Sequence, residues 1–322
     1  MKRSPPILCK PPCFGFSFHI MTTTKYNKKQ KLGEGTYSQL FNAENPETGE
    51  IVILKYIHTD QNMEGISSSS LREISILKYA DHPNIVKLLD VFHEQNKIAL
   101  VLEQMYTDLN RFINTGKSIK MDLIRSYSFQ LLAGVYYLHY NGIIHGDIKP
   151  KNILLNKAGF IKLCDFGTSC YYHHPIMYSH ENVKLHWYQP PEILIGVPTY
   201  DHGYDVWCCG CVIAEMILHA PLFGGDSCIQ QLILILNKMG LPSESEWPDL
   251  YKYVDQSSLN AKEQTKTFDT LFEGTDPDLK DLVKKLLTLN PKNRISAKDA
   301  LQHPFFDPIR EALSTSCLSF LK

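Results

Sequence analysis

The stretch His145-Gly146-Asp147-Ile148-Lys149-Pro150-Lys151-Asn152, followed by Asp165-Phe166-Gly167, decides the fold of this chain. The segments 153–155 and 161–164 are short apolar runs, and the residues between them at 156–159 favour a turn. Two apolar runs joined by a short turn predict a β-hairpin. The polar loop therefore leads directly into one strand of the hairpin, and the Asp-Phe-Gly triplet follows the other.

The open end of this hairpin would bring Asn152 beside Asp165, one an amide and the other a carboxylate. Two oxygen-bearing side chains placed together are suited to a hard cation such as Mg2+. Asp147 and Lys149 lie just upstream, so they are a candidate base and a candidate cation for an anionic substrate. Any one of these residues alone would be interpreted as part of a polar loop, but the spacing of the set favours a catalytic loop.

The composition is that of a globular protein large enough for two lobes or domains. Of the 322 residues 43% are hydrophobic, which allows a sizeable buried core. The 33 Lys and Arg residues balance 34 Asp and Glu residues, so no general attraction to nucleic acid or to an anionic membrane is expected. No apolar run approaches the roughly 18 residues of a membrane span.

The nine cysteines are irregularly spaced, and no secretory signal is recognised at the N-terminus. This pattern favours free thiols in a reducing compartment, so we expect the protein in the cytoplasm and/or the nucleus. Cys208-Cys209-Gly210-Cys211 contains a C-x-x-C spacing, but it lies in the apolar run 206–218, which predicts a buried helix with buried thiols rather than a redox or zinc site. The adjacent His173 and His174 lack a second ligand pair and are interpreted as loop residues.

A glycine-rich turn is expected near the start of the chain, in the sequence Leu32-Gly33-Glu34-Gly35-Thr36-Tyr37 between two extended segments. Backbone N–H groups of such a turn can close over phosphates, although glycine turns between strands are common. Lys55 lies in the following β-branched segment 50–57 and, taken alone, is most often a solvated lysine of a strand. Neither signal identifies a nucleotide site by itself.

A helix is predicted over residues 71–80, and it carries Glu73. Two interpretations of Glu73 are open from the sequence. Ser70 and Glu73 have the spacing of a capping box, which would give Glu73 a role at the helix start. Alternatively, Glu73 could form an ion pair with Lys55.

The character of the sequence changes near residue 105. The first third is rich in strands and has one helix, and a buried type of strand is predicted at 98–103. Beyond residue 105, helical periodicity extends over 121–139 and recurs in the leucine-rich stripe 279–287. This order predicts a small β-rich lobe followed by a larger helical one.

Residues 26 to about 307 resemble the eukaryotic protein kinases, most closely the cyclin-dependent kinases. The family's motifs occur in its order and spacing, and they are the glycine turn, Lys55, Glu73, His145-Gly146-Asp147, Asn152, Asp165-Phe166-Gly167 and Pro190-Pro191-Glu192. The closer assignment rests on three stretches, namely Gly33 to Tyr37, the segment 67–73 where that family carries its cyclin-binding helix, and Arg294-Ile295-Ser296-Ala297.

The resemblance implies an α+β, bilobal protein-kinase fold. Residues 1–24 would be a disordered or non-native extension, because they are rich in proline and fit no regular element. The N-lobe would span 25–104 and the C-lobe 105–307, and residues 308–322 would form a C-terminal tail. The pair Glu192 and Arg294 would brace the large lobe as a buried ion pair, and Asp205 would tether the catalytic loop from the helix beneath it.

The resemblance also implies an ATP- and Mg2+-dependent Ser/Thr protein kinase that acts on protein substrates. Asp147 would accept the proton of the substrate hydroxyl, Lys149 is typical of Ser/Thr kinases, and Asn152 and Asp165 would bind Mg2+. The residues implied to bind ATP are Leu32, Gly33, Gly35, Leu40, Lys55, Glu73, Glu103, Met105 and Leu154. A cyclin-like activator would bind the helix that contains Ser67 to Glu73.

The sequence departs from the family where a phosphate on the activation loop is gripped. Gly146 and Cys170 replace two arginines that would join Arg72 around that phosphate. A phosphate at Ser179 would find one charged partner rather than three, so activation by loop phosphorylation is expected to be weak or absent.

Other departures affect nucleotide and substrate binding. Ile53 stands where the family has an alanine against adenine, which could cost about 1–3 kcal/mol in overpacking. Lys184-Leu185-His186 replaces the segment with the family's threonine, and Gln189 replaces an arginine that shapes the site for proline after the target residue. Two hypotheses therefore stand, an active kinase that prefers Ser-Pro or Thr-Pro sites, and a pseudokinase that acts as a scaffold.

Overall fold

The computed structural model describes residues 26–34, 38–57, 67–94, 97–172, 176–177, 187–254 and 266–310. The chain divides into two compact units. The first comprises residues 1–66 and 88–103, and the second comprises residues 67–87 and 104–322. Among the described residues, no helix has both the length and the apolar character needed to cross a membrane.

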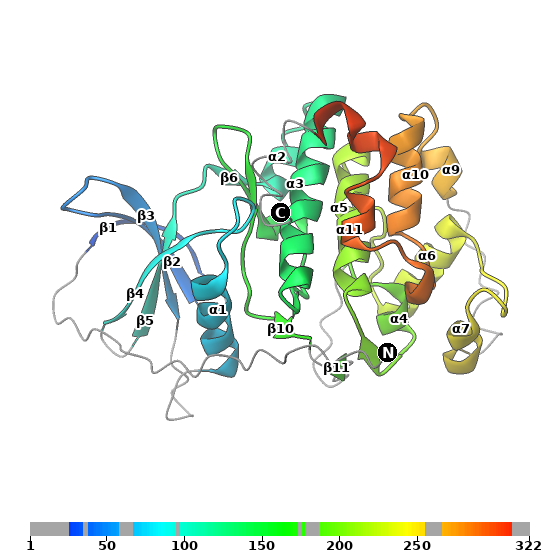
Figure 1. Ribbon diagram of the computed structural model, residues 1–322, viewed down its shortest axis with the longest axis horizontal. Helices are drawn as coiled ribbons and strands as arrows, with labels where there is room; N and C mark the ends of the chain where they lie inside the picture. The colour runs from blue at the N-terminus through cyan, green and yellow to red at the C-terminus, as the bar shows by residue number, and fades with distance from the viewer. Residues whose placement is uncertain are drawn as a thin grey trace, which may run out of the picture. The chain divides into compact units, whose positions relative to one another are not determined.

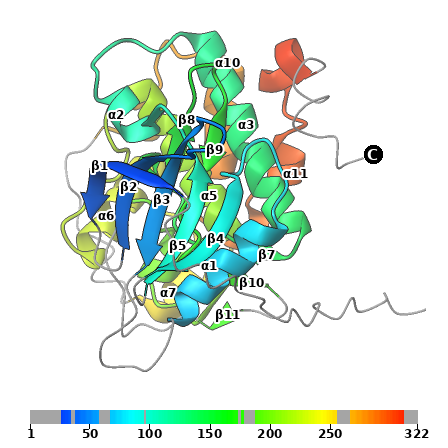
Figure 2. The same ribbon diagram turned by 90° about the vertical axis from the view of Figure 1, so that its left-hand side faces the viewer.

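The first unit is built on one five-stranded antiparallel sheet with the strand order β1-β2-β3-β5-β4. Figure 2 looks onto this sheet. Its strands are β1 (Asn27–Glu34), β2 (Ser38–Glu44), β3 (Ile51–Ile57), β4 (Leu88–Glu94) and β5 (Lys97–Glu103). The strands predicted on either side of the glycine turn and at 98–103 are therefore confirmed.

The two faces of this sheet carry different side chains, because successive residues of a strand point to opposite faces. One face packs the core of the unit around the buried rings of Tyr26, Tyr56 and Phe92. On β3, Ile53 and Lys55 alternate with the residues of that core, so they belong to the opposite face.

The second unit holds the helices, and Figure 1 shows α3 and α5 side by side within it. Its helices are α1 (Ser68–Tyr79), α2 (Leu109–Ile113), α3 (Met121–Tyr140), η1 (Pro150–Asn152), α4 (Pro191–Leu194), α5 (Gly203–Leu218), α6 (Cys228–Met239), α7 (Pro248–Tyr253), α9 (Phe268–Leu271), α10 (Pro277–Leu286), η3 (Pro291–Asn293), α11 (Ala297–Ala300) and η4 (Pro304–Ile309). Its short strands are β6 (Thr107–Asp108), β7 (Ile143–Ile144), β8 (Ile153–Leu155), β9 (Ile161–Leu163), β10 (Cys170–Tyr171), β11 (Ile176–Met177) and β12 (Thr199–Tyr200). A sheet-based unit and a helix-rich unit confirm the predicted α+β class.

Helix α1 begins earlier than predicted. Its N-cap is Ser67, whose hydroxyl accepts a hydrogen bond from the backbone N–H of Ser70. Of the two interpretations left open for Glu73, the capping box with Ser70 is therefore wrong, because Ser70 lies inside the first turn. Glu73 lies one turn further on and is buried, so it does not cap the helix start.

The core of the second unit forms where α5 packs on α3 and α10. The predicted leucine-rich stripe is buried at Leu279, Leu282, Val283, Leu286 and Leu287. The helices approach closely at Gly210, where a Cβ atom would lie only 2.8 Å from Cδ2 of Leu287.

The cysteines of α5 lie inside this core. Cys208, Cys209 and Cys211 are free and buried, as predicted. Burial raises the pKa of each thiol. A thiol that stays protonated is a poor nucleophile, so these cysteines pack as small apolar side chains.

Candidate active site

The predicted hairpin is formed by β8 and β9, with Ile153 opposite Leu163 and Leu155 opposite Ile161. At its open end the backbone N–H of Cys164 donates to the carbonyl oxygen of Asn152 at 3.0 Å. The pairing thus brings the end of the polar loop next to the residue that precedes Asp165. This part of the sequence prediction is confirmed.

Two polar side chains of the loop, Lys149 and Asn152, converge on the carboxylate of Asp147. Lys149 Nζ lies 2.9 and 2.7 Å from the two carboxylate oxygens of Asp147. Asn152 Nδ2 donates to Asp147 Oδ2 and to the Asp147 carbonyl oxygen, both at 2.8 Å. The Asp147 side chain keeps 15% of its surface exposed. The carboxylate is therefore held in a fixed position while remaining accessible to a reactant.

The residues predicted to hold a metal ion suit Mg2+. Both amide protons of Asn152 are directed at Asp147, which leaves its oxygen Oδ1 for a cation. Asp165 is exposed and adopts a left-handed φ of 65°, a conformation concentrated at functional sites. In the described part of the chain, no group of three His, Cys, Asp or Glu side chains suits a metal ion. Mg2+ is usually bound by one or two carboxylates together with substrate phosphates, and this pair fits that pattern.

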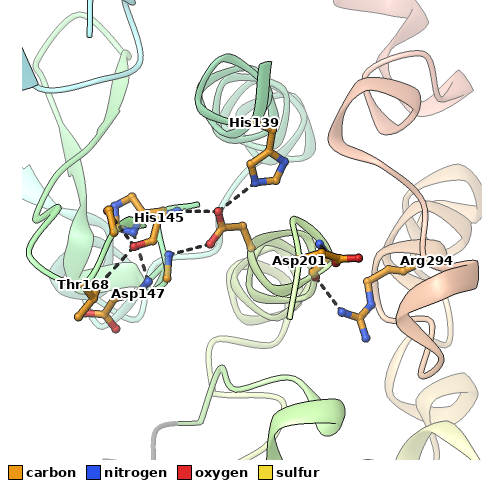
Figure 3. Close-up of polar contacts among 10 residues, drawn as sticks. His139, His145, Asp147, Thr168, Asp201 and Arg294 are labelled. Atoms are coloured by element: carbon orange, nitrogen blue, oxygen red, sulfur yellow. Dashed lines mark hydrogen bonds and ion pairs between the residues drawn. The ribbon is translucent and has the colours of Figure 1, made fainter. Parts of the chain in front are cut away.

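The start of the loop is anchored on Asp205 of α5, as predicted. The carboxylate of Asp205 accepts backbone N–H groups from His145 at 2.8 Å and from Gly146 at 2.9 Å (Figure 3). His139 Nε2 of α3 lies 3.0 Å from the same carboxylate. Burial alone would raise the pKa of Asp205, but the hydrogen bond and charge of His139 outweigh it, so this pKa is lowered. Asp205 therefore stays ionised and holds the loop.

His145 is fully buried and hydrogen-bonded at both ring nitrogens. Its Nδ1 accepts the backbone N–H of Asp147 at 3.3 Å, and its Nε2 lies 3.1 Å from the carbonyl oxygen of Cys164. The tautomer that satisfies both partners carries its proton on Nε2. The ring thus connects the peptide of the candidate base to Cys164, the residue that precedes Asp165.

The predicted ion pair of Glu192 and Arg294 is confirmed. The two guanidinium nitrogens Nη1 and Nη2 lie 2.8 and 2.9 Å from the two oxygens of Glu192. The remaining N–H groups of Arg294 donate to the carbonyl oxygens of Thr288, Gly203 and Leu289. Every N–H of this buried guanidinium is therefore satisfied, which compensates for its desolvation.

The residues predicted to bind ATP belong to both units. The first unit contains Leu32, Gly33, Leu40, Lys55 and Glu103, and the second contains Glu73, Met105 and Leu154. Leu40 and Lys55 are cross-strand partners, so they share one face of the sheet. Gly35 lies outside the described residues.

A model of a known protein family matches most of the chain. The family model of the protein kinase domain matches residues 26–306. The chain belongs to the protein kinase family. Membership implies that the kinase uses ATP with a divalent metal ion and acts on protein substrates.

Several sequence predictions for this kinase lie outside the described residues. They concern residues 1–24, the pair His173 and His174, the candidate phosphosite Ser179, and the segment 184–186. For the C-terminal tail, only residues 308–310 are described.

The sequence predictions did not include two residues that hold the catalytic loop, His139 and Ser169. His139 is a largely buried polar side chain near the end of α3, directly after the mainly apolar stretch 131–138, and that position was the available signal. Ser169 is buried beside the loop, where its hydroxyl donates to the carbonyl oxygen of His145. Nothing in the sequence distinguishes Ser169 from the other serines of the chain.

The stability of this region is expected to depend on pH through His202, which precedes α5. Burial lowers the pKa of His202 from 6.5 to about 4, and the charge of His139 lowers it further, while Asp205 and Asp201 act in the opposite direction. Between pH 6.5 and 4 the unfolded chain therefore binds more protons than the folded chain, so stability falls as the pH is lowered.

The prediction is that His202→Asn reduces the loss of Tm between pH 6.5 and pH 5. The matched control is His93→Asn in β4, for which the wild-type slope of Tm against pH is expected. An unchanged slope for His202→Asn would contradict the assignment.

Proposed function

We propose that this protein is an active Ser/Thr protein kinase of the cyclin-dependent type. The observation that supports this best is the cluster of Asp147, Lys149 and Asn152, in which a carboxylate that keeps 15% of its side-chain surface exposed is fixed by three hydrogen bonds from an ammonium and an amide group. A scaffold has no need of a base, a cation and a metal ligand held together in this way.

In the proposed mechanism, Asp147 accepts the proton of the substrate hydroxyl as the oxygen attacks phosphorus. Lys149 lies close enough to Asp147 to orient it and to stabilise negative charge on the transferred group. Asp205 and His139 keep the loop in place, so the reacting groups need little reorganisation. The lysine two residues after Asp147 favours Ser and Thr rather than Tyr as targets.

The chain's own residues would hold Mg2+-ATP as follows. Asn152 and Asp165 would contact the metal ion, Lys55 would contact the α and β phosphates, and Glu73 would pair with Lys55. When bound, Mg2+-ATP supplies the phosphoryl group and the metal charge that neutralises it. The adenine would contact the backbone of Glu103 and Met105.

The first test of this proposal is the melting temperature of the full chain with and without Mg2+-ATP. A ligand at about one hundred times its dissociation constant stabilises a protein by about 2.7 kcal/mol, so a clear rise in Tm is expected. The rise should require both the metal and the nucleotide. Absence of any shift at millimolar ATP would overturn the nucleotide site.

The second candidate function is a pseudokinase that binds partners without phosphoryl transfer. Ile53 favours it, because this branched side chain lies on the same sheet face as Lys55 and opposite Leu102, where adenine is proposed to bind. A full cellular function in an Asp147→Asn variant would support the pseudokinase, and a complete loss would support the kinase.

We further propose that the kinase prefers Ser-Pro or Thr-Pro sites and is activated by a cyclin-like partner. The partner would bind α1 and its N-cap, where Ser67, Ser68 and Ser69 are exposed. A peptide array without enrichment for proline after the target residue would overturn the first claim. An activity that no cyclin-like protein raises would overturn the second.

The kinase is expected to work without phosphorylation of the activation loop. Only Arg72 remains of three arginines that could grip a phosphate, so a phosphate at Ser179 gains little there. We predict that Ser179→Ala has wild-type activity within about twofold, measured as kcat on one protein substrate. A loss of tenfold or more would show that the phosphate is required.

A further inference from the structure

The backbone of His145 is held on two sides. Its N–H donates to Asp205, and its carbonyl oxygen accepts the hydroxyl of Ser169 at 2.9 Å. The hydroxyl of Thr168 reaches the same carbonyl oxygen at 3.3 Å (Figure 3). The peptide that precedes the catalytic loop is therefore fixed between α5 and the segment that follows Asp165-Phe166-Gly167.

Ser169 also contacts helix α1. Arg72 Nη1 donates to the carbonyl oxygen of Ser169 at 3.1 Å. The backbone N–H of Ser169 donates to the carbonyl oxygen of Phe166 at 3.1 Å, and Ser169 is completely buried. Ser169 therefore connects three segments: its carbonyl oxygen accepts from α1, its N–H donates to the Asp-Phe-Gly turn, and its hydroxyl donates to the start of the catalytic loop.

The neighbouring strands support the same connection. Cys170 pairs with Ile144 in the ladder of β10 and β7, and the N–H of Tyr172 donates to the carbonyl oxygen of Gly142 at 2.6 Å. Gly146 adopts a φ of 77°, and a Cβ atom there would lie 3.2 Å from the carbonyl oxygen of Thr168. Glycine thus permits the close approach of the two segments.

The contacts that Ser169 makes are neutral hydrogen bonds, apart from the one donated by the guanidinium of Arg72. Without the hydroxyl of Ser169, the carbonyl oxygen of His145 would keep only the longer side-chain hydrogen bond, from Thr168 at 3.3 Å. Weakening the hydrogen bonding of a buried carbonyl oxygen costs free energy, so a hydroxyl is favoured at Ser169. The arrangement needs no phosphate, because donors and acceptors already belong to the folded chain. These hydrogen bonds lie beside Gly146 and Cys170, the two residues that replace the family's phosphate-binding arginines.

We propose that Ser169 is a positioning residue that holds the catalytic loop and α1 against the start of the activation segment in place of a loop phosphate. The proposal rests on the kinase activity proposed above and names a residue that regulates that same site. Ser169 touches neither substrate nor nucleotide in this role; it acts through the carbonyl oxygen of His145 and through Arg72.

The test compares Ser169→Ala with Ser128→Ala in the full chain. Ser128 is a matched control, because it is also completely buried in the second unit and its hydroxyl has no hydrogen-bond partner among the described residues. For Ser169→Ala we expect kcat to fall about tenfold while KM for ATP changes little. Ser128→Ala should leave both constants unchanged. Thr168→Val, at an exposed position, should cause a smaller fall in kcat.

Hydrogen exchange provides a readout that does not depend on catalysis. In Ser169→Ala the amides of residues 143–147 should exchange at least about tenfold faster than in the wild type, and those within α5 should not. Ser128→Ala should show neither change. Unchanged exchange and unchanged kcat in Ser169→Ala would overturn the proposal. A third outcome separates the two proposals. If the wild type transfers no phosphate but Ser169→Ala still exchanges faster than the wild type at residues 143–147, the proposed function is refuted and the positioning role stands.

Discussion

Replacing Asp147 by asparagine is expected to lower kcat by a factor of about 10² to 10⁴, the usual contribution of a general base. An amide cannot take up the proton of the substrate hydroxyl. It would also turn one N–H donor toward either Lys149 or Asn152, both of which donate to Asp147 in the native loop. The change is measured as steady-state phosphotransfer to one protein substrate.

The variant should still bind nucleotide, because Asp147 is not among the residues proposed to hold Mg2+-ATP. The rise in Tm on addition of Mg2+-ATP should therefore match that of the wild type. Asp122→Asn is the matched control, because Asp122 is 92% exposed and pairs with Arg125 on the surface. Equal kcat values for Asp147→Asn and Asp122→Asn would refute the role of Asp147.

Replacing Arg294 by methionine should destabilise the kinase by about 3–5 kcal/mol, which corresponds to a fall in Tm of roughly 10 °C. The reason is that Glu192 would remain buried without its partner, since its side chain is only 3% exposed. The carbonyl oxygens of Thr288, Gly203 and Leu289 would also lose their donors. The measurement is thermal unfolding at neutral pH.

Lys285→Met is the matched control for this change. Lys285 and Asp281 form an ion pair in which each side chain is about half exposed, so its loss should cost less than about 1 kcal/mol. A double variant that replaces Glu192 by leucine in addition should recover part of the stability lost in Arg294→Met. Similar Tm values for Arg294→Met and Lys285→Met would show that the buried pair does not brace the fold.

The parts of the structure that were predictable depend on local sequence. The turn residues between two short apolar runs specify the β8–β9 hairpin, and this places the loop that ends at Asn152. The helical periodicity of 121–139 and 279–287 predicted α3 and α10 closely, because one face of each helix is buried. The ion pair of Glu192 and Arg294 followed from the family resemblance, since 102 residues separate the two.

The parts that were not predictable depend on tertiary contacts. The helix was predicted to begin at Leu71, but it begins at Ser68 and is capped by Ser67, the first of four consecutive serines. The roles of His139 and Ser169 arise because separate segments meet at the backbone of the catalytic loop. Secondary-structure propensity and motif spacing do not predict such contacts between distant segments.

The most direct test of the central claim is transfer of the γ-phosphate of ATP by the full chain to a protein substrate, with and without a cyclin-like partner. The predicted result is phosphoserine or phosphothreonine in the substrate, dependent on Mg2+ and lost in Asp147→Asn. If Mg2+-ATP raises the Tm but no phosphate is transferred under either condition, the kinase assignment is contradicted and the scaffold function stands.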